Sequence, residues 1–504
     1  MKYASLFFAL LSGLLLTACS EQSVLPVTLP VPVVSTSVVV DTSQNSGASM
    51  EATPQPTQTK QPTPTLLLIP TAMATPTLWR SMPLMGAEPH HPESDSVLSL
   101  LSDSGAQIVR YNGVVWYTVE PQEGEYNWAA LRKLDIALQE LAARDIDVIL
   151  IVRGTPGWAQ KVYGSACGPI AQEKFASFAN FVTELVKRYS APPYNVKYWE
   201  FGNEPDVAPE LVSAASVFGC WGDSQDVFYG GGYYAEMLKT VYPAVKAADP
   251  EAQVLIGGLL LDCDPEFPPD GKTCHPARFF EGILANDGAN YFDIVSFHGY
   301  PHYGLGSLFL DWDYPSWNVR GGVIVGKINY LRHVMRQYGV DKPIFLTESS
   351  LICSERNIAE CRPPDDLFFD KQADYLVRLF VRNWALDVAG TIWYQFEDKG
   401  WRYCGMVGAD PNNPNPAYVA FDFMNEKLAG MGYTGEVPLP DGVAGYIFEG
   451  NDRQTWVLWS QDESPQTIEL PSGIFAAYNK LGQQIHLQSE QMTITSPIYL
   501  DLSP

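Results

Sequence analysis

The stretch "YWEFGNEP", from Tyr198 to Pro205, holds two carboxylates, Glu200 and Glu204, at a spacing of four residues. It continues the mostly apolar and aromatic run Val196–Phe201, which is typical of a buried strand. Pro205 cannot extend that strand and predicts extended geometry for the residue before it. We therefore expect Glu204 at the carboxyl end of a strand. Glu200 shares its parity, lies one layer deeper and needs partners there.

Runs of this kind alternate with segments of helical periodicity over most of the chain. A first strand is expected around Met85–Ala87, and seven more at 107–116, 147–154, 196–204, 253–261, 292–300, 342–350 and 390–398. Helices are expected at 127–145, 172–190, 233–250, 277–288, 326–339 and 370–388. Continuous apolar strands alternating with helices favour an α/β protein with a parallel sheet. Eight units predict a (β/α)8 TIM barrel, and a doubly wound open sheet is the alternative.

The pattern changes near Gly430, where the helices stop. Six short strands follow, punctuated by Gly, Pro, Asn and Asp, at 445–450, 454–461, 466–471, 475–482, 492–496 and 498–502. They predict a small all-β, sandwich-like C-terminal domain. We place the barrel at residues 79–432 and this β-domain at 433–504.

The amino-terminal region reads as an export signal followed by a tether. Residues 1–19 contain an early lysine, the apolar run Leu6–Leu16 and then small residues before Cys19. The ending Leu16-Thr17-Ala18-Cys19 resembles the bacterial lipobox. The resemblance implies cleavage before Cys19 and a lipid on its sulfur, so the partner would be a membrane reached through acyl chains. An ordinary cleaved signal is the alternative. Residues 20–78 are rich in Pro, Thr and Ser and are expected to form a disordered linker.

The charge and the cysteines narrow the setting further. The net charge of −25 disfavours nucleic acid as a partner and leaves neutral ligands such as sugars open. In an oxidising compartment the cysteines after Cys19 are expected to pair in part, which leaves Cys404 as the odd one. Cys263 with Cys274, and Cys353 with Cys361, are close enough in sequence to close single loops, Cys167 with Cys220 is a further candidate pair, and the connectivity stays open. No CxxC pair exists in the chain, which argues against a structural zinc site.

A second carboxylate is expected at the same end of the barrel. Glu348, in "PIFLTESS", follows the seventh predicted strand, and Glu204 follows the fourth. The two strands face each other across the barrel mouth, where active sites of this fold lie. Two converging carboxylates suit glycoside cleavage, with one carboxyl protonated and one ionised. Mutual repulsion is expected to raise the pKa of one of them.

These residues carry a family resemblance that spans Met85 to about Gly430. The stretch Trp199–Pro205 is similar to the acid/base strand of glycoside hydrolase clan A, a group of retaining (β/α)8 enzymes. The resemblance implies that Glu204 is the acid/base and Glu348 the nucleophile. It also implies that Asn203 binds the sugar 2-hydroxyl and that Arg110 orients the nucleophile. His298 and Tyr300 match a His-x-Tyr motif of the sixth strand, in which Tyr300 hydrogen-bonds the nucleophile. Trp393 is expected to form the floor of the sugar subsite.

Within the clan the chain looks most like family 39, which includes β-xylosidases and α-iduronidases. That family usually has a histidine two residues past the second-strand arginine, where this chain has Asn112. Two more aromatic residues, Trp116 and Trp158, follow the second and third strands. They are expected either to stack on sugars or to pack in the core.

The sequence thus predicts a retaining glycoside hydrolase that cleaves β-glycosidic bonds of oligo- or polysaccharides. The predicted chemistry uses no cofactor and no metal. The alternatives are a non-catalytic glycan-binding lipoprotein on the same barrel, and a transglycosylase that uses the same residues. The sugar, the exo or endo mode and the oligomeric state stay open.

Overall fold

The computed structural model describes residues 78–213, 215–304, 315–353, 361–408, 412–450 and 452–503. Residues Ala74–Pro504 form one compact unit. The predicted signal peptide, the lipidation residue Cys19 and, except for Leu78, the predicted linker lie outside the described residues.

Eight parallel strands close into a barrel. They are β2 (Leu84–Ala87), β3 (Ile108–Val115), β4 (Asp147–Arg153), β5 (Tyr198–Phe201), β6 (Gln253–Ile256), β7 (Val295–Gly299), β8 (Ile344–Ser349) and β9 (Gly390–Trp393). The strand order is β6-β5-β4-β3-β2-β9-β8-β7, and parallel bridges between Leu255 and Ile294 and between Leu259 and Phe297 join its two ends. The predicted (β/α)8 barrel is confirmed, and the open-sheet alternative is wrong.

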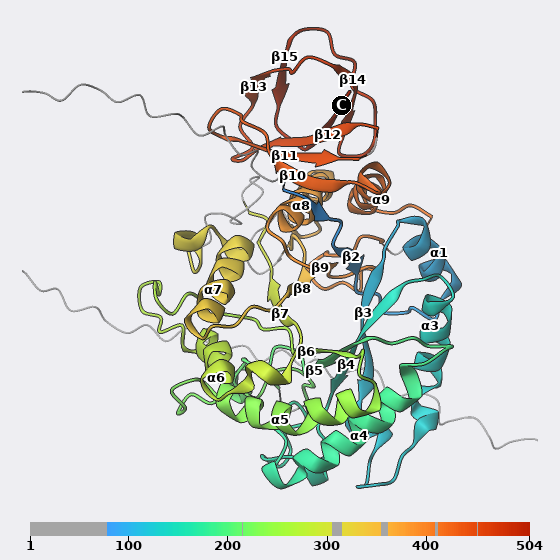
Figure 1. Ribbon diagram of the computed structural model, residues 1–504, viewed down its shortest axis with the longest axis vertical. Coiled ribbons are helices and arrows are strands. Elements are labelled where there is room, and N and C mark those ends of the chain that lie inside the picture. The colour runs from blue at the N-terminus through green and yellow to red at the C-terminus, as the bar shows by residue number, and fades with distance from the viewer. Residues whose placement is uncertain are drawn as a thin grey trace, which may run out of the picture. The chain divides into compact units, whose positions relative to one another are not determined.

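Helices surround the strands, as Figure 1 shows. They are α1 (Asp95–Asp103), the short α2 (Trp116–Val119), α3 (Arg132–Ala142), α4 (Phe175–Tyr189), α5 (Gly231–Ala248), α6 (Phe279–Ala285), α7 (Val323–Gln337), α8 (Asp366–Ala385) and α9 (Pro416–Leu428). Each of the six predicted helices is present. The sequence reading missed α1, the short α2 and α9, although α9 starts at a proline in its first turn, a common helix-start signal.

The barrel interior changes from apolar to polar along its axis. One closed cluster fills the amino-terminal end with Ile108, Ile149, Leu255, Ile294, Phe345 and Ile392. Side chains two and four residues further along a strand point to the same interior, one and two layers higher. There the chain places charged residues, including Glu88, Arg110 and Glu200, all nearly or fully buried. The carboxyl end of the barrel is therefore a polar chamber on an apolar floor.

The C-terminal region forms the predicted all-β domain. A six-stranded sheet has the order β1-β10-β11-β12-β16-β14, and β13 (Gln466–Glu469) pairs with β15 (Gln491–Ile494). The remaining strands are β1 (Arg80–Ser81), β10 (Gly432–Glu436), β11 (Val443–Glu449), β12 (Gln454–Ser460), β14 (Ile474–Asn479) and β16 (Ile498–Leu502). Leu458, Ile468, Ile494 and Leu500 share one apolar core, so the arrangement is sandwich-like. The sequence reading did not foresee that β1, which precedes the barrel, joins this sheet.

Three disulfides match the expected pairings: Cys167–Cys220, Cys263–Cys274 and Cys353–Cys361. Cys404 is a free, buried cysteine, also as expected. Three disulfides are typical of proteins in extracellular or periplasmic compartments. Within the described ranges, no helix has both the length and the apolar character that a bilayer crossing requires.

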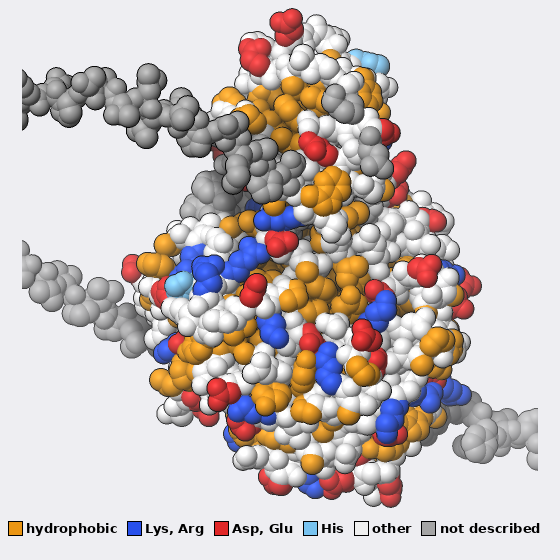
Figure 2. Space-filling view, in the orientation of Figure 1, with side chains coloured by type: hydrophobic (Ala, Val, Ile, Leu, Met, Phe, Trp, Pro, Cys, Tyr) orange, Lys and Arg blue, Asp and Glu red, His pale blue; other side chains and the backbone are white. Residues whose placement is uncertain are grey.

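Acidic side chains are spread over the visible face in Figure 2, on the barrel as well as on the C-terminal domain. The acidic residues behind the net charge of −25 therefore do not form a single patch on this face.

Candidate active site

Arg110 is the centre of the polar chamber. Its side chain is fully buried on β3, and its Nε donates to Glu200 Oε2 at 2.6 Å. Nη1 donates both to Glu88 Oε2, at 2.8 Å, and to Glu348 Oε1, while Nη2 donates to Asn203 Oδ1 at 2.6 Å. These carboxylates raise the pKa of Arg110 well above its ordinary value and outweigh the effect of burial. Arg110 is therefore a fixed cation that orients four side chains.

Glu348 lies at the end of β8 with a side chain that is 9% exposed. One oxygen accepts from Arg110 Nη1, and the other accepts from the hydroxyl of Tyr300. Burial is the largest cause that raises the pKa of Tyr300 well above its usual range, so the phenol keeps its proton and donates. Each oxygen of Glu348 thus has a donor, as suits an ionised carboxylate.

Glu204 stands in the loop directly after β5, with a side chain that is 15% exposed. Its backbone has a φ of 52°, in the left-handed region, so the extended geometry expected before Pro205 is wrong. A tertiary hydrogen bond from Glu204 N to Gly258 O, at 3.0 Å, and a turn bond from Val207 N to Glu204 O, at 3.0 Å, override the local preference. A strained non-glycine residue of this kind is common at functional sites.

His298 connects the two carboxylates. Its Nδ1 lies 3.0 Å from Glu204 Oε1 and 3.4 Å from Glu348 Oε2. Burial lowers the pKa of His298 to about 3, so the imidazole is neutral near pH 7. The predicted neighbours Arg110, Asn203, His298 and Tyr300 therefore all surround the carboxylate pair.

The proton affinities of the carboxyls differ from solution values. Burial is the largest cause that raises the pKa of Glu204 to about 7, and the charges of Arg110 and Lys327 oppose it. Repulsion between the two carboxylates was the expected cause, and burial replaces it as the main one. Glu88 also reaches a pKa of about 7, through burial and, to a lesser extent, the charge of Glu348.

The carboxylates approach each other closely. One oxygen of Glu204, one of Glu348 and a ring nitrogen of His298 lie within 4.8 Å of one another. Such a group can in principle ligate a metal ion, but hydrogen bonds with Arg110, Tyr300 and within the group already engage these side chains. The arrangement can hold one proton and one negative charge close together in the chamber.

The structure corrects the position of the predicted floor residue. Trp393 is fully buried, its indole donates to Cys404 O at 2.9 Å, and its ring lies 6.1 Å from that of Tyr375 on α8. Because Ile392 lines the barrel interior, Trp393 points outward to the helices. The half-buried Tyr394 has the interior parity instead, and its ring meets that of Tyr300 edge to face at 6.0 Å.

Trp116 and Trp158 belong to an aromatic cluster behind the chamber. Trp116 is 1% exposed, stacks on Phe181 at 5.6 Å and donates to Glu120 at 2.6 Å, so of its two expected roles it takes the one of packing in the core. Trp158 packs edge to face on Trp116 at 5.3 Å and donates to Glu120 O at 3.2 Å. Trp158 is half-buried, and its role in a subsite stays a prediction.

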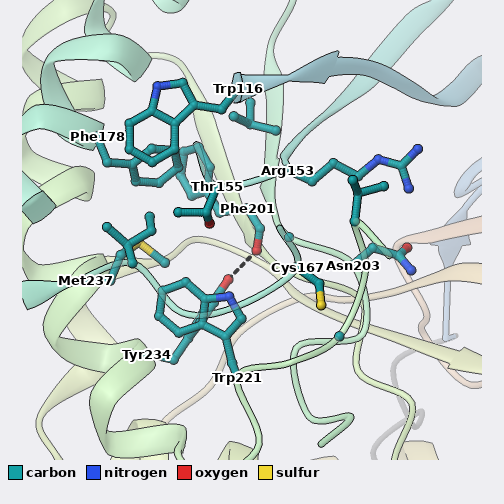
Figure 3. Close-up of a pocket in the computed structure, with 16 residues that line it drawn as sticks. Trp116, Arg153, Thr155, Cys167, Phe178, Phe201, Asn203, Trp221, Tyr234 and Met237 are labelled. Atoms are coloured by element: carbon teal, nitrogen blue, oxygen red, sulfur yellow. Dashed lines mark hydrogen bonds between the residues drawn. The ribbon is translucent and has the colours of Figure 1, made fainter. Parts of the chain in front are cut away.

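The same region contains a pocket between the ends of β4 and β5 and the helices α4 and α5, shown in Figure 3. Trp116, Phe178, Trp221 and Met237 supply apolar walls, and the hydroxyl of Tyr234 donates to Phe201 O at 2.6 Å. Arg153 and Asn203 also line it, whereas Glu204 and Glu348 are not among its lining residues.

Two residues near the pair, Glu88 and Trp401, were missed by sequence reasoning. Glu88, at the end of β2, accepts from Asn112 Nδ2 at 2.6 Å as well as from Arg110. Asn112 thus uses the position where family 39 usually has histidine to hold Glu88. Trp401 is 38% exposed, and its ring lies 5.4 Å from those of Tyr300 and Tyr394. Glu88 could have been identified from its position directly after the first predicted strand, where side chains of the barrel mouth are expected.

Comparison with known proteins agrees with this fold. Residues 71–314 match the model of the family described as cellulase, glycosyl hydrolase family 5. The match includes Glu204 and ends before Glu348. A family 39 glycoside hydrolase from the gut symbiont Bacteroides cellulosilyticus WH2 superposes with a TM-score of 0.63 at 18% identity, over 84% of this chain and 81% of that one. The resemblance to the clan A glycoside hydrolases is confirmed.

Other clan A barrels are also similar. A family 30 subfamily 8 xylanase from Clostridium acetobutylicum gives a TM-score of 0.55 at 13% identity, over 85% of this chain and 98% of that one. A family 51 α-L-arabinofuranosidase from Bifidobacterium longum gives 0.55 at 14% identity, with the same coverages. At such identities the likeness shows the (β/α)8 barrel fold. No curated protein sequence matches this chain.

Proposed function

We propose that the chain is a retaining glycoside hydrolase that cleaves β-glycosidic bonds of oligo- or polysaccharides by double displacement. Glu204 is the acid/base and Glu348 the nucleophile. The observation that carries the proposal is the approach of their oxygens to within 4.8 Å. Retaining enzymes hold the two carboxyl groups about 5–5.5 Å apart, whereas inverting enzymes need about 6.5–9.5 Å to admit a water between them.

In the first step Glu204 donates its proton to the glycosidic oxygen while Glu348 attacks the anomeric carbon. A pKa of about 7 keeps Glu204 protonated in neutral or mildly acidic solution. Arg110 and Tyr300 hold one oxygen of Glu348 each, which fixes the direction of attack. The leaving group departs as an alcohol, and the sugar stays on Glu348 as an ester.

In the second step Glu204, now ionised, takes a proton from a water that attacks the same carbon. Formation of the ester removes the negative charge of Glu348. The pKa of Glu204 falls as a result, so Glu204 is ionised in this intermediate and can act as a base. The bond to Glu348 breaks, the sugar leaves with its original configuration, and both carboxyls return to their starting states.

A trapping experiment tests the assignment. A 2-deoxy-2-fluoro glycoside with a good leaving group is expected to label the peptide that contains Glu348, and Glu348→Gln is expected to lose both labelling and turnover. Glu490→Gln, at an exposed position of the C-terminal domain, is the control. Proton NMR of the first product is expected to show retained configuration. An inverted product, or near-normal turnover by Glu348→Gln, would refute the mechanism.

We also propose the setting of this activity. The chain is exported and held at a bacterial envelope by a lipid on Cys19, with a tether over 20–78, the catalytic barrel over 79–432 and the β-domain over 433–504. The three disulfides support an oxidising compartment. Labelling with a palmitate analogue is expected to mark the parent chain and not Cys19→Ser. A labelled Cys19→Ser chain would refute the anchor.

A further inference from the structure

Arg153 is the last residue of β4 and faces the barrel interior. It pairs in register with Val115 of β3, and Ile149, four residues earlier on β4, lines the interior. Alternation along the strand therefore directs Arg153 into the same upper layer as Glu88 and Asn112. In Figure 3 its guanidinium extends to the same side as the side chain of Asn203, away from the aromatic wall of the pocket.

This guanidinium makes no hydrogen bond and no ion pair with any residue that the structure describes. Its Nε is inaccessible to solvent and has no partner. Among the described arginines, Arg132, Arg336 and Arg402 also lack such bonds. Arg132 and Arg336 are exposed, and the guanidinium of Arg402 lies over the ring of Trp401, 4.9 Å from its centroid. Burial lowers the pKa of Arg153, and the surrounding carboxylates do not fully compensate. Arg153 is half-buried, and a partly desolvated cation without a protein partner is costly, so a partner from outside the chain accounts for its retention.

The nearby carboxylates are not hydrogen-bonding partners of Arg153. Glu88 accepts from Asn112 on one oxygen and from Arg110 on the other. Glu348 accepts from Arg110 and from Tyr300 in the same way. Arg110 thus donates to both carboxylates. The charges of Glu88 and Glu348 are nevertheless close enough to raise the pKa of Arg153 in part. The N–H groups on the two terminal nitrogens of Arg153 remain available to a ligand in the chamber.

We propose that Arg153 binds an anionic substituent, a carboxylate or a sulfate, on a sugar unit of the substrate held in the chamber. The planar guanidinium matches both oxyanions with two parallel hydrogen bonds. His298 is neutral, and each nitrogen of Arg110 already donates to a protein group, so neither competes for the anion. The proposal rests on the proposed hydrolase function and names the class of glycan that it acts on.

The test uses the full-length chain and matched nitrophenyl β-glycosides. Each set has a neutral hexoside, the corresponding hexuronide, and the hexoside with a sulfate on its primary hydroxyl, in the gluco and the galacto series. Hydrogen bonds to charged groups are worth roughly 1.5–3 kcal/mol, which corresponds to a preference of about 10- to 150-fold in kcat/KM. We expect one anionic member to be preferred by that factor, and the preferred member identifies the carboxylate or the sulfate.

The variants assign the preference to Arg153. Arg153→Gln is expected to abolish the ratio of anionic to neutral kcat/KM, and Arg153→Lys to keep part of it. Arg132→Gln, on the exposed side of α3, is expected to keep the parent ratio. A parent chain that cleaves the neutral glycosides as well as the anionic ones would overturn the proposal and leave the hydrolase function intact. So would an Arg153→Gln variant that keeps the parent ratio.

A binding measurement separates the two proposals when no glycoside is cleaved. The melting temperature of the parent is expected to rise more with glucuronate, or with glucose carrying a sulfate on its primary hydroxyl, than with glucose. Arg153→Gln is expected to lose that difference. A parent that responds equally to all three ligands would overturn the anionic site. An unequal response without cleavage would support the site and count against the hydrolase.

Discussion

Nδ1 of His298 lies 3.0 Å from Oε1 of Glu204, and the imidazole is fully buried. Its other nitrogen, Nε2, has no partner among the described residues and faces Gly258, where a Cβ would come within 2.0 Å of it. A neutral imidazole has one N–H, and only the Nδ1 side offers an acceptor. We infer that Nδ1 carries the hydrogen and donates to Oε1, which leaves Oε2 of Glu204 to carry the catalytic proton.

The pH dependence of turnover should report Glu204. Because burial raises its pKa to about 7, the acid form needed for the first step is lost as the pH rises through 7. We expect kcat/KM to fall on the alkaline side with an apparent pKa near that value. For an aryl glycoside whose leaving group needs no proton, the alkaline limb should be weaker. A profile that stays flat from pH 5 to pH 9 would contradict the assignment.

The same raised pKa should destabilise the folded chain at alkaline pH. The folded state binds the Glu204 proton between its ordinary pKa of 4.5 and about 7, where the unfolded state releases it. Stability from this group is therefore lost as the pH rises through that window. Glu204→Gln removes the burial of a charge and is expected to gain on the order of 1–3 kcal/mol at pH 8, and much less at pH 4. Urea unfolding at the two pH values measures this, and an equal gain at both would argue for a different cause.

Tyr300→Phe should slow the chemistry through Glu348. The hydroxyl of Tyr300 donates to Oε2 of the nucleophile. Without it, we expect kcat to fall by about 10²- to 10³-fold, by analogy with the loss of one donor in an oxyanion hole. Tyr330→Phe is the matched control, because it removes a buried hydroxyl that donates to Ala277 O at 2.9 Å outside the site. Similar losses in both variants would mean that the effect is general.

Removing Arg110 should affect folding as well as catalysis. Arg110→Met leaves Glu88, Glu200 and Glu348 without their common cation in a buried chamber. Breaking such a network is expected to cost about 3–5 kcal/mol of folding free energy, less at low pH where the carboxyls are protonated. Denaturant unfolding measures the loss. Arg336→Met, at an exposed position of α7, is expected to stay within about 0.5 kcal/mol of the parent.

Trp401→Ala should weaken substrate binding more than the chemical step. The ring is 38% exposed beside Tyr300 and Tyr394, and Arg402 covers it at 4.9 Å. Loss of one aromatic contact, worth about 0.5–1.5 kcal/mol, is expected to raise KM by about 2- to 13-fold with little change in kcat. Phe475→Ala, exposed on the C-terminal sheet, is the control. A selective loss of kcat would instead place Trp401 in the chemistry.

Much of the fold was accessible from sequence because it repeats. Each barrel strand is a short run buried on both faces, and each predicted helix has one apolar stripe, so the alternation identified the barrel. Glu204 and Glu348 were accessible because strand ends meet at one rim. Trp393 was misplaced because a strand buried on both faces gives no sequence signal of which residues face inward, and Ile392 settles this only once the strands are paired.

Other features depend on contacts between distant parts of the chain. The left-handed backbone of Glu204 follows from its bond to Gly258, which no local preference of Pro205 predicts. The choice between the two roles expected for Trp116 depends on α4, which supplies Phe181 and Phe178 to cover its ring. The absence of described partners around Arg153 became visible only when the donors to Glu88 and Glu348 were known.

The pairing of β1 with β10 has a consequence for how the molecule unfolds. Arg80 and Ser81 pair with Tyr433 and Gly432, and only two residues separate them from the first barrel strand at Leu84. Trp384 of α8 also packs on Phe448 of the same sheet, with ring centroids 4.7 Å apart. Unfolding of the barrel removes the edge strand β1 from the C-terminal sheet. Heating is therefore expected to give one cooperative transition rather than two.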